Sequence, residues 1–279
     1  MTRNPFLVGA PSPIGMIAAL GLALLAASPA AAQDRDAQGR LTVFGWSLTG
    51  ARIGMSFEPD YLGSNDYRLA PTGSLSLSRH EVGEPRFGAP DDGLSVSLVG
   101  DDALSAGLVG RWRSGRDNKN DLRGFERVGG TVEGGGFVNW WPADWLRVRG
   151  EVRHGVGGHV NWAADLGADA VERSGAWVLS AGPRLAWADD RFTRSYFQVT
   201  PLDAARSPLG VQAFAPSGSF WSPGALASAE YRVSKHWSLT AVGEYHRLTG
   251  DAADSPIVAR LGSKDQYGAS LSVRYAFGS

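Results

Sequence analysis

Apolar and polar residues alternate along much of the chain from residue 43 onward, most clearly near its end. Between 266 and 277 the odd positions are apolar, from Tyr267 to Phe277, and the even positions are small or polar. Successive side chains of a β-strand point to opposite faces, so each such stretch predicts a strand with one apolar face. The pattern predicts twelve strands, near residues 43–57, 67–79, 84–90, 92–100, 103–114, 128–140, 145–156, 159–171, 175–188, 220–232, 236–248 and 266–277. The strand at 84–90 is the weakest, because prolines stand at both of its ends, and ten or fourteen strands are alternatives.

This alternation fits either a soluble β-sandwich with an apolar core or a membrane barrel with a lipid-facing apolar surface. Aromatic residues stand at both ends of the apolar faces, as Trp177 with Trp187 and Trp237 with Tyr245. These faces are also rich in Gly and Ala, which fill a core poorly. Connections alternate between short ones, near 141–144, 172–175 and 233–236, and long ones, near 58–66, 114–126, 189–219 and 249–265. These observations favour a transmembrane antiparallel up-and-down β-barrel with its short turns in the periplasm.

The first 32 residues have the features of a cleaved signal peptide. Arg3 precedes an apolar stretch from 14 to 27, and three alanines end at Ala32. A membrane anchor is the alternative, although this stretch is shorter than the roughly 20 residues that a helical span needs. We therefore expect a signal peptide at 1–32, a periplasmic tail at 33–42 and a barrel at 43–279. The formal net charge of −1 gives no indication of a nucleic-acid partner, and a closed barrel needs no disulfide in this Cys-free chain.

Charged residues fall on the face that would line the barrel lumen. By the predicted register this face carries eight arginines and four glutamates, an excess of about four positive charges. Free arginines would favour anions in a channel, whereas arginines paired with acids across strands would close the lumen. The predicted lumen residues are Arg111, Arg113, Glu133, Arg147, Arg149, Glu151, Arg153, Arg184, Glu230, Arg232, Glu244 and Arg274.

Several loop motifs resemble those of the MipA/OmpV family of outer-membrane proteins. The strongest is the stretch from Leu248 to Val258, with support from 61–64, 157–159, 164–167 and 196–199. Gln198 replaces the Gly usual in that last motif, and Gly278 and Ser279 follow the aromatic residue on which such barrels usually end. The resemblance implies the outer membrane of a Gram-negative bacterium. It also implies a scaffold role that links a murein-cleaving lytic transglycosylase to a bifunctional penicillin-binding protein.

The signature loop contains Gly250, Asp251, Asp254, Ser255 and Pro256. Its two carboxylates could hold a divalent cation or contact a partner, or they could make the turn bonds that fold the loop. Enzymatic barrels exist, but the five histidines, at 80, 154, 159, 236 and 246, lie in no recognisable catalytic motif, and we expect no cofactor or metal.

The resulting hypothesis is a monomeric, non-enzymatic outer-membrane protein that contacts lipid and murein-processing enzymes. A porin-like small-solute channel is the alternative, and an enzyme or an adhesin is less favoured.

Overall fold

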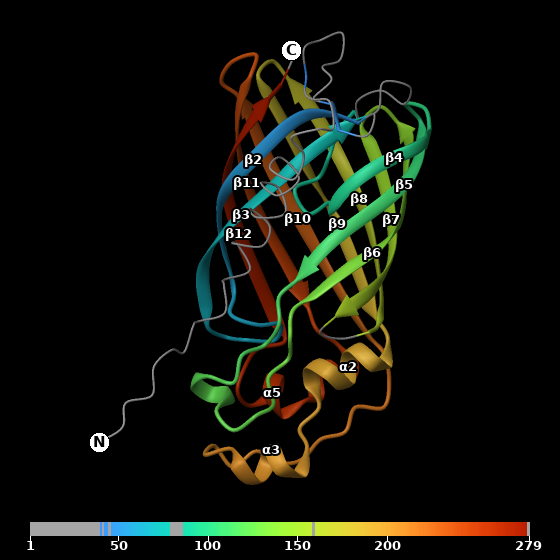
Figure 1. Cartoon of the computed structure of the whole chain (residues 1–279). Helices are drawn as coiled ribbons and strands as arrows, with labels where there is room; N and C mark the ends of the chain where they lie inside the picture. Colours follow the sequence, from blue (N-terminus) through green and yellow to red (C-terminus); the bar gives the residue numbers. More distant parts are fainter. Residues whose placement is uncertain (1–39, 41, 44–45, 79–85, 158–159, 278–279) are drawn as a thin grey trace, which may run out of the picture.

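The computed structural model describes residue 40 and residues 42–43, 46–78, 86–157 and 160–277. The predicted signal peptide, most of the predicted tail, His80 and His159 lie outside these residues. The chain forms one antiparallel sheet that curls around a lumen (Figure 1). Its strands are β1 Thr42–Val43, β2 Trp46–Pro59, β3 Tyr67–Ser78, β4 Leu94–Gly100, β5 Leu104–Arg113, β6 Thr131–Ala143, β7 Leu146–Gly157, β8 Trp162–Ser174, β9 Trp177–Ala188, β10 Phe220–Arg232, β11 Trp237–Arg247 and β12 Asp265–Ala276.

Among the described residues each strand pairs with the next one in the chain except β3 with β4, and β12 pairs with β2. The sequence prediction of an antiparallel β-barrel fold is thereby confirmed. A shift of register between Leu48 and Gly50 marks a bulge in β2 where it pairs with β3. The strand predicted at 43–57 consists of β1 and β2, with residues 44–45 outside the description.

The prediction of a strand at 84–90 is wrong for its described residues, because 86–93 contain none. The sheet reaches twelve strands only through the two-residue β1. Because no strand forms at 86–90, β3 and β4 run in the same direction. The described residues form no hydrogen-bonded ladder between these two strands. Pro90 cannot donate to a ladder. Two carboxylates that follow it, Asp91 and Asp92, instead bind arginines inside the barrel.

The two faces of the sheet differ as the alternation predicted. Val152, Leu166 and Leu271 are exposed on the outside, whereas Arg149 and Thr240 are buried inside. Aromatic rings pair across strands at both ends of the outer face. The pairs are Trp177–Tyr231 and Trp237–Tyr275 near the short turns, and Trp187–Trp221 and Tyr245–Tyr267 near the long loops. An apolar band between two aromatic girdles is the exterior of a membrane barrel. Among the described residues, every helix is too short or too polar to cross a membrane.

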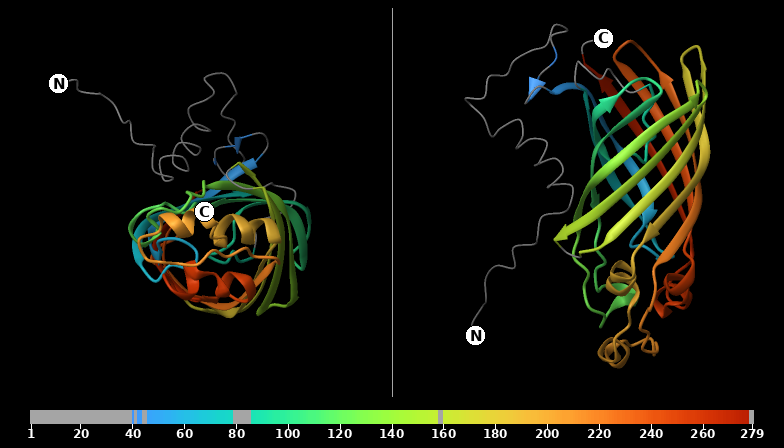
Figure 2. Two further views of the ribbon diagram at one scale, coloured as in Figure 1. Left: turned by 90° about the horizontal axis from the view of Figure 1, so that it is seen from below. Right: turned by 90° about the vertical axis from the view of Figure 1, so that its right-hand side faces the viewer.

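The long connections fold into short helices at one end of the barrel, a feature that the sequence did not predict. They are the 3-10 helix η1 Asn120–Leu122 and the helices α2 Asp190–Phe197, α3 Pro201–Arg206, α4 Gly250–Asp254 and α5 Pro256–Ala259. Figure 2 shows them across the barrel end opposite the short turns and the end of β12. We call this region the cap. It has two apolar clusters, one around Phe197 and Leu248 and one around Val199 and Ile257.

Candidate functional site in the barrel lumen

Residues 86–93 begin at the barrel end that carries the short turns and run from there into the lumen. We call them the inner segment. Arg86 lies at that end, where its guanidinium donates to Asp144 Oδ1 at 2.8 Å and stacks on the Trp141 ring. A turn follows, in which the Asp92 amide donates to the Ala89 carbonyl at 3.0 Å. Ala89 is 6% exposed, so this turn lies within the barrel and not on its surface.

Two adjacent carboxylates attach the inner segment to the barrel wall. Asp91 accepts from Arg184 Nε at 2.7 Å, and its carbonyl accepts from Arg111 Nη2 at 2.8 Å. Asp92 accepts from Arg147 Nη2 at 2.6 Å. Because these arginines come from β5, β7 and β9, the inner segment is held by three separate strands.

The wall itself carries further ion pairs around a buried arginine of β7. Arg153 donates to Glu133 at 3.0 Å, to Glu151 at 2.5 Å and to Asp165, and its side chain is 0% exposed. Arg147, six residues earlier on the same strand, pairs with Asp169 at 3.3 Å. A buried charge is tolerated only with such partners, because desolvation otherwise costs several kcal/mol per ion.

These contacts join into one set of charges that we call the lumen network. Each of its arginines forms at least one ion pair with an acid of the set, and the two signs are equal in number. The network therefore has no excess charge. Its members are Arg111, Arg113, Arg147, Arg149, Arg153 and Arg184 with Asp91, Asp92, Glu133, Glu151, Asp165 and Asp169.

Four of the twelve predicted lumen charges lie apart from this network. Glu230 pairs with Arg52 at 3.5 Å on the opposite wall, and Arg274 is the register partner of Arg52. Glu244 is half-buried on β11. Arg232 is exposed at the end of β10, because its strand has reached the edge of the barrel there.

Sequence reasoning missed five charges that the structure places in the lumen. Asp165 and Asp169 lie on the inward face of β8, where the alternation with Ala164 and Leu166 could have revealed them. Asp91 and Asp92 belong to the inner segment, which was predicted as part of the wall. With Arg52 added, the predicted excess of positive charge nearly disappears.

The signature loop forms α4 and α5 and ties the cap together. Ser255 is fully buried, donates from Oγ to the Phe197 carbonyl at 2.6 Å and accepts from the Ile257 amide. Pro256 follows at the first position of α5, where a missing N–H has no cost. Gly250 begins α4 with a positive φ of 58°, which glycine adopts readily.

The two signature-loop carboxylates have different surroundings. Asp251 Oδ2 accepts from the amides of Ser217 and Gly218 at 2.6 and 3.0 Å. These hydrogen bonds, with that from Ser217 the stronger influence, lower the pKa of Asp251. Asp254 is exposed. Among the described residues no group of three or more His, Asp or Glu is placed to hold a metal ion, and the contacts of Asp251 support its role in folding the loop.

Two of the other loop motifs, 61–64 and 196–199, lie in the same region, whereas 164–167 belong to β8. Gly63 donates its amide to Gln266 Oε1 at 2.9 Å and adopts a positive φ of 96°. A Cβ at this position would stand 2.6 Å from Val258 Cγ2, so only glycine fits. The motif residues near 61–64, 196–199 and 248–258 therefore pack together although they lie far apart in the sequence.

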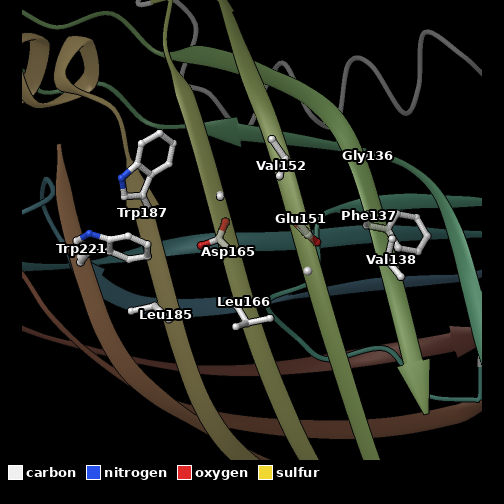
Figure 3. A pocket seen from close by; sticks show the side chains of 12 residues that line it. Gly136, Phe137, Val138, Glu151, Val152, Asp165, Leu166, Leu185, Trp187 and Trp221 are labelled. Carbon is white, nitrogen blue, oxygen red and sulfur yellow. The ribbon is translucent and has the colours of Figure 1, made fainter. Parts of the chain in front are cut away.

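A shallow apolar groove lies on the outer face of β6 to β9 (Figure 3). Its lining includes Gly136, Gly150, Val152, Leu166 and Trp187. In Figure 3 the side chains of Glu151 and Asp165 point to the other face of the sheet. The groove thus shows the same division of apolar outside from charged inside.

A family model described as "MltA-interacting protein MipA" matches residues 52–277. The chain belongs to this family. Among curated proteins it is similar to the MltA-interacting proteins of Escherichia coli (strain K12) and Shigella flexneri, with 31% identity to each over 85 residues. That region is 30% of this chain and 33% of each relative, so the match spans about a third of the relatives' length.

The MipA-family chain is also similar to solved outer-membrane structures. The alignment with the NanC porin covers 81% of this chain and 98% of the porin chain, with 9% sequence identity and a TM-score of 0.42. The alignment with the COG4313 outer membrane channel from Pseudomonas putida F1 covers 88% of this chain and 99% of the channel chain, with 14% sequence identity and a TM-score of 0.42.

Proposed function

We propose that this MipA-family chain is a non-enzymatic outer-membrane barrel that acts as an interaction protein of the cell envelope and does not conduct solutes. The observation that carries this proposal is the neutral lumen network, which ties the inner segment to β5, β7 and β9. A porin-like channel is the second candidate, because the structure does place many arginines in the lumen.

Anion conduction through an arginine-lined pore depends on cations that are free to attract the passing ion. In the lumen network each arginine already has a carboxylate partner, and the most buried of them, Arg153, has three. A passing anion would have to compete with these partners at every step. The inner segment also occupies part of the lumen, with Ala89 buried and Asp91 bridging β5 and β9.

The exterior and the connections support the proposed placement in the membrane. The apolar band between aromatic girdles would contact outer-membrane lipid of a Gram-negative cell. The short turns, near 144–145, 175–176 and 233–236, lie at the same end as the end of β12 and would face the periplasm, with the cap outside the cell. A murein-processing partner would therefore meet the short turns and Arg86, and not the cap.

Binding of a purified lytic transglycosylase of the MltA type to the refolded protein in lipid nanodiscs tests this proposal. Asp144 is 93% exposed in the turn between β6 and β7, and Asp254 is exposed on the cap. We expect Asp144→Arg to weaken binding at least several-fold and Asp254→Arg, the matched control, to leave it unchanged. Absence of binding by the unchanged protein, or weakening by Asp254→Arg alone, would contradict the proposed role.

A further inference from the structure

The charge balance of the lumen network depends on the inner segment. Ten of its twelve members belong to strands of the barrel wall, and those ten comprise six arginines and four acids. The remaining two acids, Asp91 and Asp92, come from a connection that forms no strand. The wall alone therefore carries two uncompensated positive charges, which two adjacent carboxylates neutralise.

The arginines that receive these carboxylates are fixed independently of them. Arg147 also contacts Asn139 at 2.9 Å and Asp169 at 3.3 Å, and Arg184 also contacts Asp169 at 2.7 Å. Arg149 pairs with Glu151 at 2.7 Å. Guanidinium groups held by wall residues would keep their positions if the inner segment withdrew, so the cradle is preorganised for an anion.

A polar cavity of about 100 Å³ adjoins the two carboxylates. Its lining includes Arg111, whose buried Nε has no hydrogen-bond acceptor among the described residues. Such a donor is costly to leave unpaired, and an oxygen ligand in the cavity would satisfy it. The cavity is also lined by Glu244 and His246 of β11.

We propose that Arg111, Arg147, Arg149 and Arg184 form a binding site for a small dianion, and that Asp91 and Asp92 are its resting intramolecular occupants. The ligand class is a dicarboxylate or a phosphate, which supplies the two negative charges that the wall lacks. Glu244 disfavours a third negative charge at the edge of the site. An anion in this cavity would lie against both carboxylates, and repulsion between like charges means that it must displace them and not merely add to them.

This displacement predicts competition between the ligand and the chain's own aspartates. The apparent affinity of a site falls in proportion to the fraction of molecules in which the site is open. Neutralising Asp91 and Asp92 removes the competitor, and it should tighten dianion binding by about tenfold or more if the aspartates occupy the site at least nine-tenths of the time. The proposal goes beyond the envelope role, and its outcome does not depend on any protein partner.

The test is isothermal titration of the refolded full chain in lipid nanodiscs with succinate and, separately, with inorganic phosphate. We expect weak binding by the unchanged protein and at least tenfold tighter binding of one or both probes by Asp91→Asn/Asp92→Asn. Glu58→Gln/Asp265→Asn is the matched control, since it removes two acids that pair with arginines outside the lumen network. That control should bind like the unchanged protein, and neutral succinamide should bind to none of them.

Adding Arg184→Gln to the double variant should abolish the tightened binding. The proposal is overturned if folded Asp91→Asn/Asp92→Asn binds neither probe, or binds both no better than the unchanged protein. It is also overturned if the control pair tightens binding equally, because the effect would then be one of net charge. Should the double variant fail to fold, Asp91→Asn alone keeps both ion pairs of Asp92, and it should still tighten binding measurably.

Discussion

Replacement of Arg153 by Met tests whether the lumen network stabilises the fold. Met keeps much of the length of the side chain and removes its charge and its donors. The change leaves Asp165 without its arginine partner and takes one of two arginines from Glu133. Breaking a buried ion pair from one side typically costs about 3–5 kcal/mol. Glu133 and Glu151 stay buried, whereas the Asp165 side chain is 31% exposed and gains some hydration, which places the cost near the lower end of that range. We expect a loss in that range for Arg153→Met.

Arg232 provides a matched control for this prediction. The sequence assigns both arginines to the lumen, but the structure leaves Arg232 exposed at the end of β10. Substitutions at such surface positions usually change stability by less than about 0.5 kcal/mol. Arg232→Met should therefore unfold like the unchanged protein. Adding Asp165→Asn to Arg153→Met should recover part of the loss, because the uncompensated carboxylate is then neutral.

The assay is urea-induced unfolding of the protein refolded into phospholipid vesicles, followed by tryptophan fluorescence and by the heat-dependent shift of its band on a gel. An Arg153→Met protein within about 0.5 kcal/mol of the unchanged protein would refute the reasoning, given the cost expected for a broken buried pair. So would an equal loss in Arg232→Met, which would point to a general effect of arginine removal.

Three further predictions concern the cap. Ser255→Ala should destabilise it by about 1–3 kcal/mol, since the Phe197 carbonyl is left buried and unpaired, and hydrogen exchange of α5 would report this loss. Gly63→Ala should cost about 1–2 kcal/mol from its positive φ alone, with a further cost from the clash with Val258, and faster thermolysin cleavage of the cap would reveal it. The lowered pKa of Asp251 means that its contribution is complete above the ordinary pKa of 3.8 and is lost as the pH falls through the lower folded value. Asp251→Asn at neutral pH should loosen the loop at 217–218 in the same way as acid does, and hydrogen exchange of that loop would show it. Hydrogen-exchange rates that stay unchanged in Ser255→Ala and Asp251→Asn would contradict the contacts assigned to these residues.

The strands were predictable because one face of each meets an apolar environment and the other a polar one. A register slip of one residue would reverse both faces, so the alternation specifies the register strongly. β10 illustrates this, because the predicted range 220–232 agrees with the observed Phe220–Arg232. The short turns also lie where Gly, Asp and Ser interrupt the alternation.

The inner segment could not be predicted from local pattern. Its residues alternate between apolar and polar, although only weakly, and they therefore resemble a strand. Its actual position is determined by ion pairs with arginines of β7 and β9, which lie far away in the sequence. The cap helices are three to eight residues long, which is too short for helical periodicity to show, and they depend on tertiary packing. Arg232 lies opposite Ser238 on the predicted face of β10, but it is exposed, because alternation alone does not say where a strand leaves the barrel.

Single-channel conductance of the refolded protein in a planar bilayer, with a salt gradient across it, tests the central claim that the lumen network closes the barrel. The account predicts that folded, inserted protein gives no steady openings. Steady anion-selective openings that weaken when Arg147 and Arg149 are neutralised would contradict it and would make this MipA-family chain a channel.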